Sequence, residues 1–175
     1  MIIEICGQDT AVSLVARAAD RISVISITST EDEDVPFAAN ENVVSILRLR
    51  FNDLTELYDE EGIPYGRPLP EQADFEGLRA FVCAPGCERL IVHCWEGASR
   101  SAAVATAVFE SRGGMDILKT QSRYEPNSLV YRLACRELGI PVGGLNYRVV
   151  PDGGGYILVH AALQDADGKG IRGQD

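Results

Sequence analysis

The sequence predicts an α/β fold in which a mainly parallel central sheet is flanked by helices. Short segments of apolar and β-branched residues alternate along the chain with segments of helical spacing, which is the order typical of parallel sheets. One segment, residues 89–93, is almost purely apolar, as expected of a strand that is buried on both faces. The 175 residues are enough to bury one core, so a single domain is expected.

The first third of the chain is expected to contain three strands and one helix. Apolar and β-branched side chains predict strands at residues 2–6, 21–28 and 43–51. Apolar side chains at helical spacing predict a helix over residues 10–19, with Asp9 or Thr10 as its N-cap. The acidic run at residues 31–34 is predicted to be a solvated loop.

The middle of the chain is expected to run from a long loop through a helix into the buried strand at 89–93. Residues 52–70 are predicted to form the loop, because glycines and prolines recur over its second half. A helix is predicted over residues 72–83. Its inner face would carry Phe75, Leu78 and either Phe81 or Val82.

Helices are expected to dominate the next segment. Small and apolar residues predict a buried helix over 101–111, ended by Gly113 and Gly114, and a short helix is predicted over 115–122. A further helix is predicted to start at residues 126–128 and to reach Leu138, where Gly139 and Pro141 stop it.

The C-terminal segment is expected to form a β-hairpin. Residues 146–150 and 156–160 are apolar or β-branched, and they flank a turn rich in glycine. We expect the domain to span residues 1–162, with residues 163–175 as a flexible tail.

Composition excludes several classes of function. The chain carries 16 basic and 26 acidic side chains, a net charge of −10, which disfavours binding to nucleic acids and to anionic membranes. Acidic Glu4 stands where a signal peptide is basic, and no apolar run reaches membrane-spanning length, so a cytoplasmic location is expected. Five cysteines without an export signal predict free thiols, and their spacing provides no zinc site.

Residues 93–101 (HCWEGASRS) carry the chemistry. They lie between the predicted buried strand and a buried helix, where ligands bind in open α/β sheets. Backbone N–H groups at a helix N-terminus favour an anion, and the Arg100 guanidinium is able to hold two phosphate oxygens at once. Cys94 would lie in the same positive field, which lowers the pKa of a thiol. A thiolate would then face a bound phosphate.

This stretch resembles the signature H-C-x5-R-[ST] of the cysteine-dependent protein tyrosine phosphatases, and is most similar to their dual-specificity branch. The matching positions are His93, Cys94, Gly97, Ser99, Arg100 and Ser101. The resemblance covers about Ile22 to Leu138 and implies a phosphatase-like fold. The first strand and helix would then be an N-terminal addition.

The resemblance implies a role for each residue of the signature. Cys94 would be the nucleophile, and Ser101 would support its thiolate and help it to leave. Arg100 would stabilise the transferred phosphoryl group, and His93 would orient the loop. The phosphate-binding loop would consist of Trp95, Glu96, Gly97, Ala98, Ser99 and Arg100. The resemblance implies no cofactor and no metal.

The leaving group requires a general acid, which the family places on a loop upstream of the signature. Asp53 follows a predicted strand and is the favoured candidate, while Asp59 and Asp74 are rivals. Further on, Arg123, Pro126 and Asn127 are similar to a stretch found in this branch, although Asn127 or Ser128 also reads as a plain helix N-cap.

Three functions remain open at this point. The first is a protein-tyrosine or dual-specificity phosphatase that acts on phosphorylated proteins. The second uses the same loop on a small non-protein phosphate ester, and the third is a catalytically idle phosphate-binding module. An intact Cys94 argues against the third function, because a pure binder has no need of the thiol.

Overall fold

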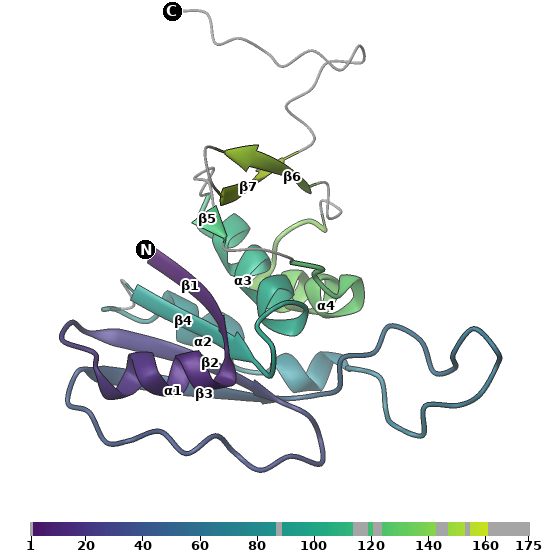
Figure 1. Ribbon diagram of the computed structural model, residues 1–175, viewed down its shortest axis with the longest axis horizontal. Coiled ribbons are helices and arrows are strands. Elements are labelled where there is room, and N and C mark those ends of the chain that lie inside the picture. Colours follow the sequence, from purple (N-terminus) through teal and green to yellow (C-terminus); the bar gives the residue numbers. More distant parts are fainter. Residues whose placement is uncertain are drawn as a thin grey trace, which may run out of the picture. The chain divides into compact units, whose positions relative to one another are not determined.

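The computed structural model describes residues 2–86, 89–113, 119–120, 124–142, 147–152 and 155–160. The chain divides into two compact units. The larger unit comprises Met1–Gly114 with Tyr124–Val142, and the smaller comprises Met115–Arg123 with Gly143–Asp175. The two units are described separately below (Figure 1).

The larger unit is built on a four-stranded sheet in which every pair of strands is parallel. The strands are β1 (Ile2–Gly7), β2 (Ile22–Thr28), β3 (Val43–Arg50) and β4 (Arg89–Cys94), in the order β1-β4-β2-β3. Strand β4 lies between β1 and β2, and all of its residues after Arg89 are buried. The predicted α/β class and the predicted parallel sheet are therefore confirmed.

Strand β1 is an integral part of this sheet. It pairs with β4 along its whole length, from Ile2 opposite Arg89 to Gly7 opposite Cys94. Strand β1 thus supports the strand that ends at Cys94, while its interpretation as an N-terminal addition to the family's fold stays a prediction. Local sequence patterns predict a strand but do not name its neighbour.

Helix α1 (Gln8–Ala16) follows β1 without a loop, so it begins and ends earlier than predicted. Its N-cap is Gly7, not Asp9 or Thr10, and no side chain caps the helix. The Gln8 backbone N–H donates instead to the carbonyl of Trp95 at 3.0 Å. This contact satisfies one of the free donors at the helix start, so a side-chain cap is not required there.

The helix predicted over residues 72–83 is broken in two. A 3₁₀ helix, η1 (Gln72–Phe75), is followed by α2 (Leu78–Cys83). Gly77 between them has φ +85°, a left-handed conformation that ends a regular helix. The predicted inner face is correct for Phe75, Leu78 and Val82, which are fully buried.

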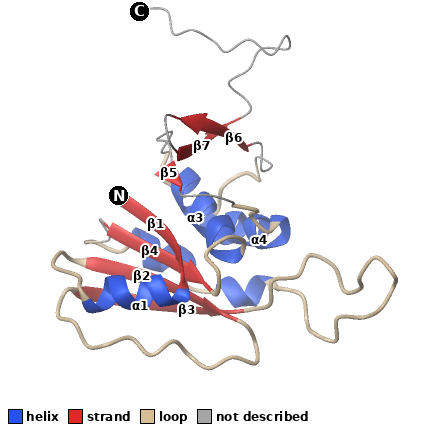
Figure 2. Ribbon diagram, in the orientation of Figure 1, coloured by secondary structure: helices blue, strands red, loops and turns tan. Residues whose placement is uncertain are grey.

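Helices α3 (Arg100–Ser111) and α4 (Ser128–Leu138) pack against each other, and α3 also packs on β4. Residues 100–108 of α3 are all buried, as the small apolar composition predicts. Helix α4 begins and ends as predicted, capped by Asn127 and stopped by Gly139. Helix α1 packs on the other face of the sheet, on the side of Val24 and Ile91 (Figure 2).

The smaller unit contains an antiparallel sheet in the order β5-β7-β6. Its strands are β5 (Lys119–Thr120), β6 (Tyr147–Asp152) and β7 (Gly155–His160). Lys119–Thr120 is a strand, so the predicted helix over 115–122 is wrong there, and its other residues lie outside the described ones. The predicted hairpin stays a prediction, because its turn at 153–154 is not among the described residues.

The predicted domain bounds, residues 1–162, also stay a prediction, and the predicted tail at 163–175 lies outside the described residues. Among the helices of the described residues, none is long and apolar enough to cross a membrane.

Candidate active site

Cys94 ends β4 and opens the signature loop. Its side chain is buried, with 2% of the residue exposed. The backbone N–H of Gly97 donates to Cys94 Sγ at 3.3 Å, and Ser101 Oγ lies 3.2 Å from the same sulfur. Hydrogen bonds of this kind stabilise a thiolate. Ser101 is the partner that the sequence predicts for this sulfur, and the Gly97 N–H is a second one that it does not predict.

Arg100 forms hydrogen bonds to residues that follow two strands of the sheet. Its Nη1 donates to the carbonyl of Phe51 at 3.0 Å, just after β3, and to Ser29 Oγ at 3.2 Å, just after β2. The residue is only 6% exposed, and its buried Nε has no hydrogen-bond partner among the described residues. A buried guanidinium donor without an acceptor is costly, and an anion in the loop would satisfy it.

Asp53 lies at the signature loop, although it is distant in sequence. Its Oδ1 accepts hydrogen bonds from Ser99 Oγ at 2.8 Å and from Asn127 Nδ2 at 2.9 Å. Its Oδ2 lies 3.9 Å from Arg100 Nε, which is an ion pair without a direct hydrogen bond. The structure thus brings Asp53 to Ser99 and Arg100 of the loop that Cys94 opens.

The two rival acids are occupied in local turns. Asp59 Oδ1 accepts from the backbone N–H groups of Glu61 and Ile63, and Asp74 Oδ2 accepts from the N–H of Glu71 at 2.7 Å. These contacts give both carboxylates a structural explanation. Asp53, in contrast, contacts Ser99 and Arg100 of the signature loop.

His93 is fully buried behind the loop. Its Nδ1 lies 3.4 Å from the carbonyl of Cys94, to which this nitrogen donates in the tautomer that carries the proton there. Burial lowers the pKa of His93, and the charges of Arg48 and Arg100 lower it further. The imidazole is therefore neutral near pH 7, in keeping with the predicted orienting role.

The remaining loop positions divide by exposure. Trp95 and Glu96 are exposed, and the exposed fraction of Trp95 is 65%. Ser99 is the N-cap residue of α3, and its carbonyl accepts the first helical hydrogen bond from Ala103. The carbonyl of Ala98 accepts from the N–H of Glu125 at 3.1 Å. These contacts hold the loop at the N-terminus of α3, where backbone donors favour an anion.

Gly97 allows the loop to pack against the start of the chain. Its φ is +83°, and a Cβ placed there would lie 2.3 Å from Cys6 C and 2.4 Å from Gly7 N. A Cβ on Gly7 would in turn lie 3.1 Å from the carbonyl oxygens of Trp95 and Glu96. The signature loop therefore rests directly on the junction between β1 and α1, which sequence reasoning did not foresee.

Asn127 has a second function that the sequence suggested only weakly. Its Oδ1 caps α4 by accepting from the N–H groups of Leu129 and Val130, both at 3.0 Å. Its Nδ2 donates to Asp53, so one side chain caps a helix and positions the acid. The resemblance at Pro126 and Asn127 was the available signal, while Arg123 lies outside the described residues.

The other described cysteines lie outside the signature loop. Cys6, Cys83, Cys94 and Cys135 are free thiols, and Cys87 lies outside the described residues. Burial, then the charges of Glu4 and Cys94, raise the pKa of Cys6 to about 12. Burial and Glu110 raise the pKa of Cys135 to about 11. Both thiols stay protonated near pH 7 and are poor nucleophiles.

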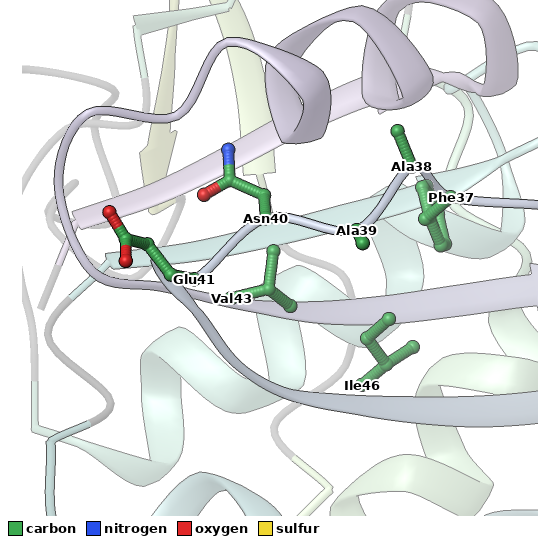
Figure 3. Close-up of a pocket in the computed structure, with 7 residues that line it drawn as sticks. All are labelled: Phe37, Ala38, Ala39, Asn40, Glu41, Val43 and Ile46. Atoms are coloured by element: carbon green, nitrogen blue, oxygen red, sulfur yellow. The ribbon is translucent and has the colours of Figure 1, made fainter.

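A hollow of about 510 Å³ lies away from these groups, between the segment at residues 37–41 and strand β3. Figure 3 shows Val43 and Ile46 of β3 on one side of it and Phe37 at one end. Glu41 is its one charged lining residue, and no nucleophile lines it. It is therefore unsuited to a phosphate, although Phe37 contacts the His93 ring edge-on, with ring centroids 5.6 Å apart.

The sequence was also compared with known proteins. No protein-family model matches it, and no curated protein matches it.

Proposed function

We propose that this protein is a phosphomonoester hydrolase of the cysteine-dependent protein-tyrosine-phosphatase type, closest to the dual-specificity branch. It acts on phosphorylated proteins, with phosphotyrosine as the preferred residue, through a phosphocysteine intermediate. The observation that carries the proposal is the environment of Cys94 Sγ, which has a backbone N–H and a hydroxyl within 3.3 Å at the start of a buried helix. The fold that goes with this function is phosphatase-like, with a C-terminal β-hairpin.

The first chemical step transfers the phosphoryl group to sulfur. The Cys94 thiolate attacks phosphorus, the bond to the ester oxygen breaks, and that oxygen leaves with the electron pair. Arg100 Nε, which is buried without an acceptor, donates to a phosphoryl oxygen as charge develops there. The N–H groups of the first turn of α3 add to this stabilisation.

Asp53 supplies the proton to the leaving oxygen. Its Oδ1 already accepts two hydrogen bonds, so Oδ2 is the oxygen that is left to carry the transferred proton. The side chain is 36% exposed, which allows a leaving group to approach it from solvent. General acid catalysis by such a group contributes about 10²–10⁴-fold.

The second step frees the enzyme. Water attacks the phosphorus of phosphocysteine, the S–P bond breaks, and Cys94 leaves as a thiolate. The Ser101 hydroxyl and the Gly97 N–H stabilise the departing sulfur. The proton of the attacking water passes to Asp53, which restores the acid for the next cycle.

The experiment that tests the proposal is the substitution Cys94→Ser. Serine keeps the size of the side chain but its hydroxyl stays protonated near pH 7, so turnover of an aryl phosphate should fall by at least about a thousandfold. Inorganic phosphate should still bind, as measured by calorimetry. Rapid acid quench of the wild type should trap phosphate on the protein, and the variant should trap none.

The variant also distinguishes the alternatives. Residual turnover within about tenfold of wild type would exclude Cys94 as the nucleophile. A wild type that binds phosphate without turnover would be an idle binding module. A wild type that hydrolyses small esters but no phosphopeptide would have a non-protein substrate.

A further inference from the structure

A narrow ribbon of chain begins directly after Asp53. We define the acidic ribbon as residues 54–66; Figure 1 shows the loop between β3 and η1 projecting beyond the sheet. Its two arms are joined by backbone hydrogen bonds, from the Tyr65 N–H to the Leu57 carbonyl and from the Asp59 N–H to the Ile63 carbonyl, both 3.0 Å. Tyr58 and Pro64 form an antiparallel bridge between them. The ribbon is therefore a structured arm.

Large apolar side chains on this arm face solvent. Among the described residues eight large apolar side chains are exposed, and four of them belong to the acidic ribbon, with exposed fractions between 48% and 60%. These four are Leu57, Tyr58, Ile63 and Tyr65. A fifth, Trp95, lies in the signature loop itself. Exposed apolar groups gathered beside a site mark a surface that binds a partner.

The charged side chains of the acidic ribbon are all acidic. The ribbon carries four acidic side chains and no lysine or arginine. The acids are Glu56, Asp59, Glu60 and Glu61. Glu56, Glu60 and Glu61 are exposed, so their charges are available to a ligand in solvent.

We propose that the acidic ribbon binds the polypeptide segment next to the phosphorylated residue of the substrate, and that it selects segments that combine basic and apolar side chains. This inference rests on the proposed function and names its substrate class. The ribbon starts one residue after the proposed general acid, so a chain that enters the site with its phosphorylated side chain passes the base of the ribbon. Carboxylates attract lysine and arginine, and the exposed rings and aliphatic groups bury the apolar side chains.

Other occupants fit the surface less well. A nucleic acid carries the same sign of charge as the ribbon, and so does a second copy of this chain, whose net charge is −10. A small phosphate ester would fill the signature loop without reaching the ribbon. A polypeptide of opposite charge is the ligand that uses both of its features.

The first test removes charge. Glu60→Gln/Glu61→Gln is compared with Glu33→Gln/Glu76→Gln, which removes the same charge at exposed positions outside the ribbon. Two phosphotyrosine peptides are used, one with lysine and leucine flanks and one with glutamate and serine flanks. We expect kcat/KM for the basic peptide to fall by about tenfold in the ribbon variant only. For the wild type, this value should also fall as salt is raised.

The second test removes apolar surface. Tyr58→Ser/Ile63→Ser is compared with Val44→Ser/Val142→Ser, which truncates exposed apolar residues elsewhere. The Tyr58 bridge is made by backbone, so its side chain can be truncated without removing it. We expect KM for the basic peptide to rise by about tenfold in the ribbon variant and to stay unchanged in the control.

An aryl phosphate serves as the internal reference, since it does not reach the ribbon. All four variants should hydrolyse it at the wild-type rate. If the wild type fails on the aryl phosphate, the proposed function is wrong, and binding of the labelled peptides to Cys94→Ser still tests the ribbon. Equal affinity of ribbon and control variants for the basic peptide, or a wild type that prefers the acidic peptide, overturns the inference.

Discussion

At the residue scale, the contacts of Asp53 lead to a prediction about leaving groups. Asp53→Asn keeps the size of the side chain but removes the proton that Asp53 donates in the proposed mechanism. Hydrolysis of an ester with a basic leaving group should fall by about 10²–10⁴-fold, because that oxygen needs the proton. An ester of a very acidic phenol should be affected much less. Turnover of both esters by the variant and by wild type measures the difference.

Two matched variants serve as controls for this assignment. Asp59→Asn and Asp74→Asn alter acids that stabilise local turns. Any change in turnover that they cause should therefore be the same for both esters. If one of them shows the selectivity and Asp53→Asn does not, the general acid has been misassigned. The nucleophile assignment would survive that result, because it rests on Cys94.

A second residue-scale prediction concerns His93 and pH. Its pKa is lowered in the folded protein from the ordinary 6.5. The unfolded chain therefore binds the proton more readily, and stability from this group is present above about pH 6.5 and lost as pH falls through the folded pKa. The free energy of unfolding in urea should fall less steeply below about pH 6.5 in His93→Gln than in wild type. Identical slopes would contradict the prediction.

The site residues that follow from local spacing are those that are adjacent in the sequence, while Asp53 was predicted from the family resemblance. Cys94, Arg100 and Ser101 fall within one strand–loop–helix segment, so their spacing is sufficient to relate them. Ser29 and Asn127 were not given a part in the site, because their contacts with Arg100 and Asp53 span 71 and 74 residues. The Ser29 contact depends on the order of the strands in the sheet, and the Asn127 contact depends on where α4 packs. Local sequence patterns specify neither.

At the element scale, the close approach of the signature loop to β1 is testable at Gly97. Gly97→Ala places a methyl group 2.3 Å from Cys6 C, so the loop or β1 must move. We expect a loss of roughly 2–5 kcal/mol in stability, from overpacking and left-handed strain together, and a loss of most activity. Urea denaturation and aryl phosphate turnover measure both effects.

Gly113→Ala separates the two causes. Gly113 also has a positive φ, +65°, but a Cβ there meets nothing within 4 Å. Gly113→Ala should therefore lower the free energy of unfolding only by the left-handed strain, about 1–2 kcal/mol, and should leave turnover unchanged. Equal losses at Gly97 and Gly113 would mean that the contact with β1 does not matter.

Elements with strong periodicity were predictable, and their interruptions were not. Strand β4 is apolar over residues 90–92, and helix α3 is small and apolar over most of residues 102–109, so their positions follow from composition. The break at Gly77 was missed because one glycine is tolerated in many helices, and the early start of α1 was missed because its first N–H is satisfied by Trp95, a residue of another segment.

At the scale of the whole molecule, the proposed reaction mechanism leads to a prediction about metals. The proposed nucleophile, acid and phosphate clamp are all side chains of the protein, and the described residues contain no group of three or more potential metal ligands. Turnover of an aryl phosphate should be unchanged after prolonged treatment with EDTA. Activity that is lost to EDTA and restored by a divalent ion would contradict the mechanism.

The pairing of β1 with β4 also sets an order of events during synthesis. Ile2 and Arg89 are neighbours in the sheet but are 87 positions apart in the chain. A ribosome adds about 5–20 residues per second, so β1 waits roughly 4–17 s for its partner to be made. Contacts between distant segments also close slowly, because a long loop must first be ordered. The Cys94 thiol therefore acquires its surroundings, which include Ser101 of α3, only after α3 has been translated.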